Sequence, residues 1–286
     1  MIMLYYLYNF ILKTDTCFEM LVECDKILRD ENIVVSLFVN KELKEEPEYI
    51  VPFKEDIRYY LYPKKNEIYV ETGDLNYLYS SFFNIPMSVF SLFKNKAIIH
   101  CNALEFNNEL YCFSGNKAIG KTTLAMFLRK YCSLFSDDCV AIDSCSDGRV
   151  YGYRAAHTLK LCKKTYDMVI NDNCYEEHFD SISQKANILL PDMQYKKAPI
   201  RKMFFLVRGN GKEFVCDKVE SLITKKILLI QSIVGKDYIP KSVIDIFGRT
   251  KLFSETIAQV PFYILKIPSV EEYNSQIQSF FNAMIK

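Results

Sequence analysis

Short apolar runs in the first part of the chain favour β-strands. They are rich in aromatic and β-branched side chains and lie at residues 4–12, 33–38, 56–62 and 66–71. Pro63 and the two lysines after it suggest a hairpin-like turn between the last two runs, and the polar stretch 40–48 is typical of a loop. Residues 18–29 carry a pattern that fits a helix. We therefore predict that residues 1–75 form a β-rich N-terminal domain.

Apolar positions in the next segment recur at roughly helical spacing. This spacing predicts a helical connector at residues 76–95, which Pro86 is expected to interrupt because proline lacks the N–H that an interior helix position needs. The segment carries no group that suggests chemistry, so a buried structural helix is the favoured interpretation.

From residue 96 onward the pattern is that of a mixed α/β domain. Predicted strands lie at 97–100, 110–114, 133–135, 140–142, 203–207 and 262–266, and predicted helices lie at 121–131 and 270–285. The first two strands are separated by a turn at Asn107 and Asn108. Residues 96–286 are therefore predicted to form a second domain.

Charge and cysteine usage narrow the class of protein. The net charge is +1 and the pI is near 7.4, so we expect neither nucleic acid nor a membrane as a partner. The 10 cysteines form no C-x-x-C pair and the chain has only 3 histidines, which argues against a zinc site. The longest apolar runs fall far short of the roughly 20 residues of a membrane helix. With no signal-peptide pattern at the N-terminus, the expected location is the reducing cytoplasm.

Residues 115–122 fit the phosphate-binding pattern G-x-x-x-x-G-K-[ST] in full, between a predicted strand and a predicted helix. The glycines permit a backbone whose N–H groups point at phosphate oxygens, and the helix N-terminus adds a positive dipole end. Lys121 is expected to reach the outer phosphates, and the Thr122 hydroxyl to hold Mg²⁺. The alternative is a glycine-bounded turn that happens to precede a lysine. The predicted nucleotide-binding residues are Gly115, Asn116, Lys117, Ala118, Ile119, Gly120, Lys121, Thr122 and Thr123.

Acidic residues follow the predicted P-loop helix at Asp137 and Asp138, where the next strand would return its end toward the phosphates. One carboxylate can take a proton from an attacking hydroxyl while the other holds Mg²⁺. His100 ends the strand before the P-loop strand, where an imidazole could contact a transferred phosphoryl group. A solvated acidic pair and a structural strand-end histidine are the alternatives. A basic cluster, which could contact an acidic substrate or form a solvated face, comprises Lys196, Lys197, Arg201 and Lys202.

Together these segments resemble the catalytic domain of HPr kinase/phosphorylase and, more closely, the HPr-kinase-like proteins of bacterial biosynthetic clusters. The matching segments are HCNA at 100–103, FSG at 113–115, GKTTLA at 120–125 and LFSDD at 134–138. The runs at 199–207 and 261–265 are similar to later strands of these relatives. The N-terminal part is similar to the small leading domain of the kinases that modify lasso-peptide precursors.

The resemblance implies an α/β fold, with a P-loop core of the HPr-kinase/phosphoenolpyruvate-carboxykinase type and a smaller β-rich N-terminal domain. It also implies transfer of a nucleotide γ-phosphate to a serine hydroxyl. Asp137 would be the catalytic base, Lys121 and His100 the other catalytic residues, and Thr122 and Asp138 the Mg²⁺ ligands. Ala118 stands where relatives usually have glycine, and a Cβ there restricts φ. The downstream Glu-bearing signature of true HPr kinases is missing, so neither HPr as substrate nor the reverse phosphorylase activity is implied.

Three functions remain open on the sequence. The leading one is an ATP-dependent (or GTP-dependent) kinase that acts on a Ser or Thr of a peptide or small protein, for which a ribosomally made precursor peptide is the first candidate. The alternatives are a non-catalytic nucleotide-binding module and an NTPase, each in a biosynthetic or regulatory complex. A homo-oligomer is one option for the assembly.

Overall fold

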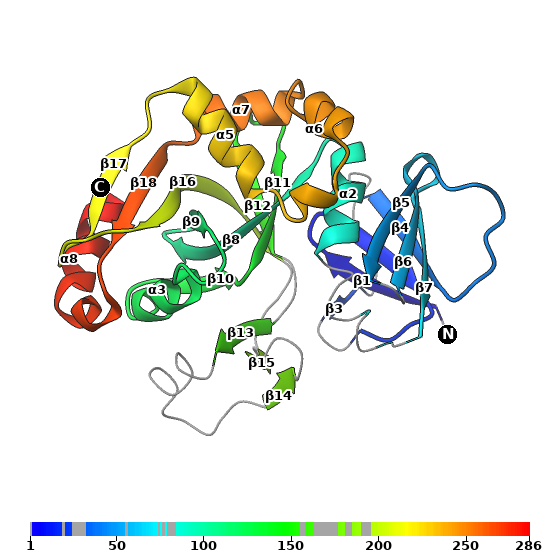
Figure 1. Ribbon diagram of the computed structural model, residues 1–286, viewed down its shortest axis with the longest axis horizontal. Helices are drawn as coiled ribbons and strands as arrows, with labels where there is room; N and C mark the ends of the chain where they lie inside the picture. The colour runs from blue at the N-terminus through cyan, green and yellow to red at the C-terminus, as the bar shows by residue number, and fades with distance from the viewer. Residues whose placement is uncertain are drawn as a thin grey trace.

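The computed structural model describes residues 2–18, 21–24, 33–54, 57–73, 75, 78, 84–154, 158–162, 177–180, 185–189 and 196–286. Within these residues the protein is a mixed α/β protein with two large mixed sheets, a three-stranded sheet and six α-helices. Figure 1 shows the two large sheets beside each other, with the N-terminal sheet in blue.

The N-terminal sheet has seven strands in the order β3-β1-β2-β4-β7-β6-β5. Their bounds are β1 Met3–Leu7, β2 Phe10–Thr14, β3 Val22–Glu23, β4 Ile33–Val39, β5 Tyr49–Lys54, β6 Ile57–Tyr62 and β7 Glu67–Thr72. The run at 4–12 is a tight hairpin, since β1 and β2 pair antiparallel around Tyr8 and Asn9. The predicted strands at 33–38, 56–62 and 66–71 are confirmed, and a 3₁₀ turn at Pro63–Lys65 joins the last two.

The helix predicted at 18–29 is wrong where the structure describes it. Leu21 N donates to Phe18 O in a turn, and β3 then pairs with β1, so tertiary pairing overrides the local apolar spacing. Residues 25–29 of that prediction lie outside the described part of the chain.

The connector contains α2, which spans Ile85–Phe93. Pro86 lies in the first turn of this helix, where its missing N–H leaves no intrahelical bond unmade, so it begins the helix rather than interrupting one. Most of residues 74–83 lie outside the described part of the chain. The buried side of α2 packs against β8 and α6 and joins the same hydrophobic cluster as both large sheets.

The second large sheet carries the predicted strands in longer form. Its members are β8 Ala97–Phe106, β9 Glu109–Gly115, β10 Ser133–Ser136, β11 Cys139–Ser144, β12 Val150–Arg154, β16 Lys197–Arg208, β17 Val215–Lys218 and β18 Phe262–Ile267. Five of these strands form a closed ring of paired neighbours, in the order β8, β11, β12, β16 and β9. The ring closes because β9 pairs parallel with β16 and antiparallel with β8. The small sheet consists of β13 Thr158–Cys162, β14 Glu177–Asp180 and β15 Lys185–Leu189.

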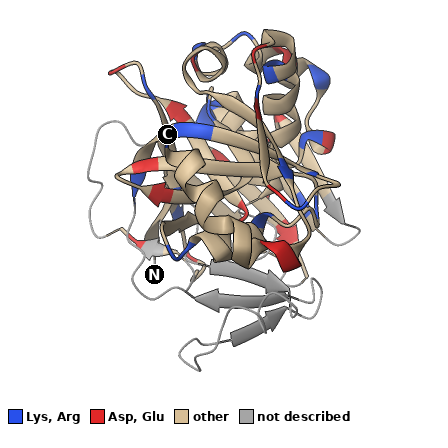
Figure 2. Ribbon diagram, turned by 90° about the vertical axis from the view of Figure 1, so that its left-hand side faces the viewer, with Lys and Arg blue, Asp and Glu red and all other residues tan. Residues whose placement is uncertain are grey.

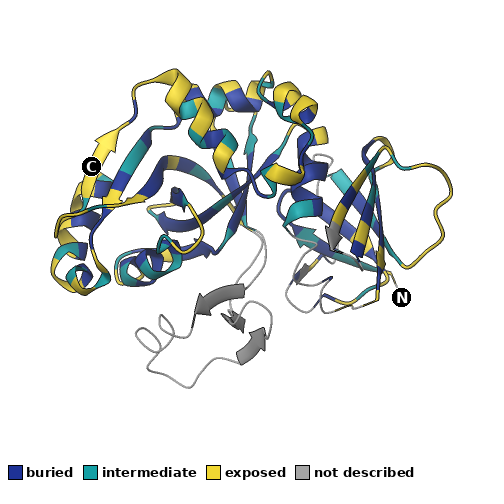
Figure 3. Ribbon diagram, in the orientation of Figure 1, coloured by how far each residue is buried: buried dark blue, intermediate teal, exposed yellow. Residues whose placement is uncertain are grey.

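Helices cover the second sheet on two sides (Figure 1). They are α3 Lys121–Leu128, α5 Leu222–Ser232, α6 Lys241–Phe247, α7 Lys251–Gln259 and α8 Tyr273–Ile285. The predicted helix at 121–131 is thus shorter, and the one at 270–285 begins as a 3₁₀ turn. Helices α3 and α8 pack together over one apolar cluster, while α5 and α7 contact β8, β11 and β12 over the other. Figure 3 shows the resulting buried layers of strands between exposed helix faces.

Polar contacts fasten the N-terminal hairpin to the second sheet. Asn9 Nδ2 donates to Asp143 Oδ2 over 3.2 Å, and Lys96 forms an ion pair with the same carboxylate. Both charged side chains are mostly buried, with 13% of Lys96 and 20% of Asp143 exposed. No helix in the described part of the chain has both the length and the apolar character needed to cross a membrane.

Candidate functional site

The glycine loop, residues 115–120, joins β9 to α3 and takes backbone angles that L-residues rarely adopt. Gly115 has φ +150° and Gly120 has φ +113°. A Cβ on Gly115 would lie 3.0 Å from the carbonyl oxygen of Leu206, so both the angle and the close approach require glycine. Ala118 has φ +63°, which means that the loop takes a left-handed turn in spite of its Cβ. Asn116, Lys117 and Ala118 are exposed at the loop tip.

Lys121 and the first turn of α3 lie behind the loop. The Lys121 ammonium donates to Gly115 O (3.0 Å) and Asn116 O (3.2 Å) and is buried, so the loop itself holds this charge in place. Gly120 is the N-cap of α3 and no side chain caps the helix, so an anion at this end would meet the positive end of the helix dipole. Arg208, at the end of β16, reaches Ala118 O at 3.5 Å from the exposed side.

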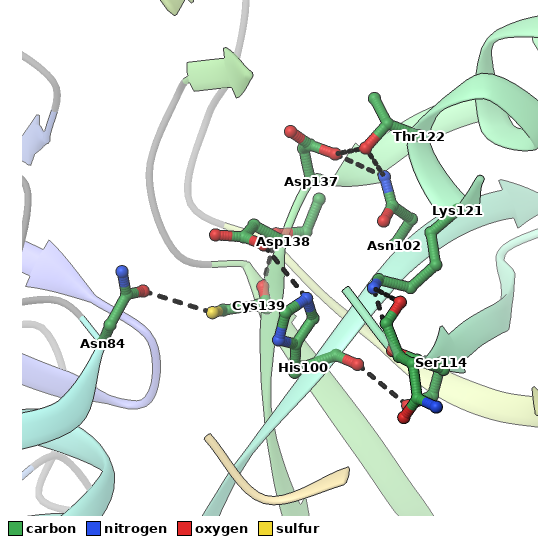
Figure 4. Close-up of polar contacts among 12 residues, drawn as sticks. Asn84, His100, Asn102, Ser114, Lys121, Thr122, Asp137, Asp138 and Cys139 are labelled. Atoms are coloured by element: carbon green, nitrogen blue, oxygen red, sulfur yellow. Dashed lines mark hydrogen bonds and ion pairs between the residues drawn. The ribbon is translucent and has the colours of Figure 1, made fainter. Parts of the chain in front are cut away.

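Thr122 and Asp137 meet on one side of the loop (Figure 4). Thr122 Oγ1 donates to Asp137 Oδ1 over 3.2 Å, and the amide of Asn102 donates to the same carboxylate oxygen. Asn102 Nδ2 also lies 3.4 Å from Thr122 Oγ1. Asp137 and Asn102 are both buried. This side of the site therefore gathers oxygen atoms of the kind that Mg²⁺ prefers.

His100 and Asp138 form a second pair, directed away from the first (Figure 4). The distance from His100 Nε2 to Asp138 Oδ1 is 3.3 Å, with 39% and 31% of the two side chains exposed. Asp138 has φ +71°, and Cys139 N donates to Asp137 O across it, which makes a tight γ-turn. This strained turn separates the two neighbouring carboxylates: Asp137 faces Thr122, and Asp138 faces His100.

Sequence reasoning missed the residues that support the second pair. Tyr8, at the tip of the N-terminal hairpin, is fully buried with φ +57°. Burial raises the pKa of its hydroxyl, and the neighbouring Cys139 and Asp138 raise it further. Asn84, which precedes α2, lies with its Oδ1 3.3 Å from Cys139 Sγ. No local pattern marks Tyr8 or Asn84, because tertiary packing alone brings them here.

The basic cluster predicted at 196–202 does not form one open face. Lys196 pairs with Glu105 (2.6 Å), Arg201 lies 3.7 Å from Glu109, and the buried Lys202 donates to Met284 O. Alternation along β16 sends these side chains in different directions. On the side of the molecule that carries α8 and β17, Figure 2 shows Lys and Arg interspersed with Asp and Glu.

Among the described residues, no group of three or more His, Cys, Asp or Glu side chains could hold a metal ion. A nucleotide-bound Mg²⁺ needs only one or two protein ligands besides phosphate oxygens and water. The Thr122 and Asp137 oxygens fit that requirement, and Lys121 with the uncapped start of α3 fits a polyphosphate.

The fold and the site define a mixed α/β protein with a glycine loop at a helix N-terminus and two acid-containing pairs beside it. No protein-family model matches the chain, and no curated protein matches it either. Membership of the HPr-kinase-like family therefore stays an expectation, and function is inferred from the geometry.

Proposed function

We propose that the protein is a phosphotransferase that moves the γ-phosphate of ATP (or GTP) to a Ser or Thr hydroxyl of a peptide or small protein. The observation that carries the proposal is the convergence of five residues at the glycine loop: the buried Lys121, the Thr122–Asp137 pair and the His100–Asp138 pair. Phosphoryl transfer requires little covalent chemistry from the protein, so phosphate binding, a cation site and a base suffice.

The geometry favours a division of roles opposite to the one that the sequence resemblance implied. Asp137, rather than Asp138, lies 3.2 Å from Thr122, so we assign Asp137 and Thr122 to Mg²⁺. Asp138, rather than Asp137, lies beside His100 and is partly exposed, so we assign Asp138 as the base. The buried position of Asp137 also suits a cation ligand better than a group that must meet a protein substrate.

Each protein group then has one task. Lys121 and the α3 N-terminus bind the phosphates and hold them in line. Bound Mg²⁺ would neutralise charge on the phosphate oxygens. His100 Nε2 contacts one oxygen of the Asp138 carboxylate, and this carboxylate would accept the proton of the attacking hydroxyl. Arg208, at the exposed rim of the loop, adds positive charge near the entering substrate.

The proposed core is a P-loop core of the HPr-kinase/phosphoenolpyruvate-carboxykinase type. Its support is the mixed sheet in which β9, the strand before the glycine loop, lies between antiparallel β8 and parallel β16. The N-terminal sheet would be the small leading domain of such kinases, and it reaches the site through Tyr8.

The direct test is transfer of label from γ-labelled ATP with Mg²⁺ to small proteins and peptides encoded near this chain. Label on a Ser or Thr of one acceptor supports the proposal and names the substrate. Steady release of phosphate that no acceptor alters would instead indicate an NTPase. Tight nucleotide binding with neither outcome would indicate a binding module.

A further inference from the structure

Asn102 lies at the centre of the proposed cation side of the site, yet it belongs neither to the glycine loop nor to the acidic pair. It comes from β8, two residues beyond His100, and its side chain lies between Asp137–Thr122 and Lys121 (Figure 4). Only 1% of the residue is exposed. No sequence pattern predicted a role for Asn102.

Hydrogen bonding fixes the orientation of the Asn102 amide. Its Nδ2 donates to Asp137 Oδ1 and approaches Thr122 Oγ1 at 3.4 Å. The opposite orientation would place the amide oxygen against a carboxylate oxygen, which repels it. The amide nitrogen thus faces the two proposed Mg²⁺ ligands, and the amide oxygen faces elsewhere.

That oxygen is unusual among buried polar atoms. Within the described part of the chain, Asn102 Oδ1 is buried and has no hydrogen-bond partner. Most buried polar atoms in proteins are hydrogen-bonded, so an exception beside the proposed cation site is a candidate acceptor for a donor that comes with the ligand. Mg²⁺ in nucleotide sites keeps several of its waters, and these waters are strong hydrogen-bond donors.

We infer that Asn102 is a positioning residue of the cation site: its Nδ2 holds Asp137 and Thr122 side by side, and its Oδ1 accepts a hydrogen bond from a water of the nucleotide-bound Mg²⁺. This inference rests on the proposed nucleotide site. Groups that orient metal ligands in this way commonly change metal affinity by 10–100-fold when they are removed.

A matched control exists in the same chain. Asn9 is also a buried asparagine whose Nδ2 donates to an aspartate, Asp143, and whose Oδ1 has no partner among the described residues. Asn9 lies in the turn of the N-terminal hairpin, and its partner Asp143 lies on β11 and belongs neither to the glycine loop nor to the acidic pair. An Asn9→Ala variant therefore carries a similar structural defect without touching the proposed cation site.

The experiment measures ADP binding by calorimetry as a function of Mg²⁺ concentration. For Asn102→Ala we expect the Mg²⁺ concentration of half-maximal effect to rise by about tenfold, with ADP affinity in EDTA unchanged. For Asn9→Ala we expect the wild-type midpoint. If Asn102→Ala does not fold, Asn102→Ser is used, and its midpoint should rise in the same direction.

Different results would overturn the inference about Asn102 and the proposed nucleotide site. If wild-type protein shows Mg²⁺-dependent ADP binding and the Asn102 variants keep its midpoint, Asn102 is a packing residue and the inference is overturned alone. If wild-type protein binds no ADP at any Mg²⁺ concentration, the proposed function and the inference are both overturned.

Discussion

Replacing Gly115 by alanine should damage the protein because two features of this residue exclude a side chain. Its φ of +150° lies where L-residues are strained, at a cost of about 1–3 kcal/mol. The new Cβ would also lie 3.0 Å from Leu206 O and 3.3 Å from Ile119 Cγ2. Crowding of this kind typically costs about 1–3 kcal/mol. The lower entropy of the unfolded alanine variant offsets about 0.4–1 kcal/mol.

These ranges give an expected loss of about 1–6 kcal/mol in the free energy of unfolding, centred near about 3 kcal/mol, together with loss of nucleotide binding. Gly148 provides the matched control, since it also has positive φ (+78°) but has nothing within 4 Å of its ideal Cβ. Gly148→Ala should therefore lose only about 1 kcal/mol, from the left-handed conformation alone.

Urea unfolding at equilibrium gives both free energies, and calorimetry with ADP and Mg²⁺ gives binding. A Gly115→Ala variant that is as stable as Gly148→Ala would refute the close approach to Leu206. A Gly115→Ala variant that binds ADP like wild type would refute the role of the loop backbone.

Other changes test neighbouring parts of the account. Ala118→Gly should raise the free energy of unfolding by about 0.5–1 kcal/mol, because relief of the left-handed strain exceeds the added chain entropy; urea unfolding that shows a loss contradicts this. Asp143→Ala should cost about 2 kcal/mol by leaving the mostly buried Lys96 unpaired, and a loss below about 0.5 kcal/mol would show that the hairpin does not depend on it. Burial raises the pKa of the Cys132 thiol from 9.0 to about 11, so with rising pH the thiol ionises first in the unfolded chain and the free energy of unfolding falls between pH 9 and pH 11. In urea titrations, Cys132→Ala should lose less stability than wild type over that range. Equal losses would exclude this thiol as the cause.

Local sequence signals predicted much of the second sheet. The strands around the glycine loop and the helix after it follow from apolar runs bounded by turn residues, and they lie where the pattern indicated. Strands β3, β5, β12 and β17 were missed. Each is held by pairing with a partner strand (β1, β6, β11 and β18, respectively) rather than by any strong pattern of its own. Pairing partners far apart in sequence leave no local trace.

Prediction of the site from sequence is limited in the same way, because long-range contacts leave no local pattern. The sequence identified Lys121, Thr122, His100 and the acidic pair, but two adjacent aspartates are chemically identical until the backbone separates them. The positive φ of Asp138 does so, and no sequence rule predicts a γ-turn there. Tyr8 and Asn102 reach the site through tertiary packing and a neighbouring strand, so only the structure shows them.

The separation of the two acidic residues gives the most direct test of the central claim, through single-turnover transfer from γ-labelled ATP by Asp137→Asn and Asp138→Asn. The two substitutions are chemically identical and one residue apart. The account predicts that Asp138→Asn binds Mg²⁺–ATP like wild type but transfers phosphate about 10²–10⁴-fold more slowly, whereas Asp137→Asn needs far more Mg²⁺ to bind ATP. Wild-type transfer rates and Mg²⁺ dependence in both variants would contradict it.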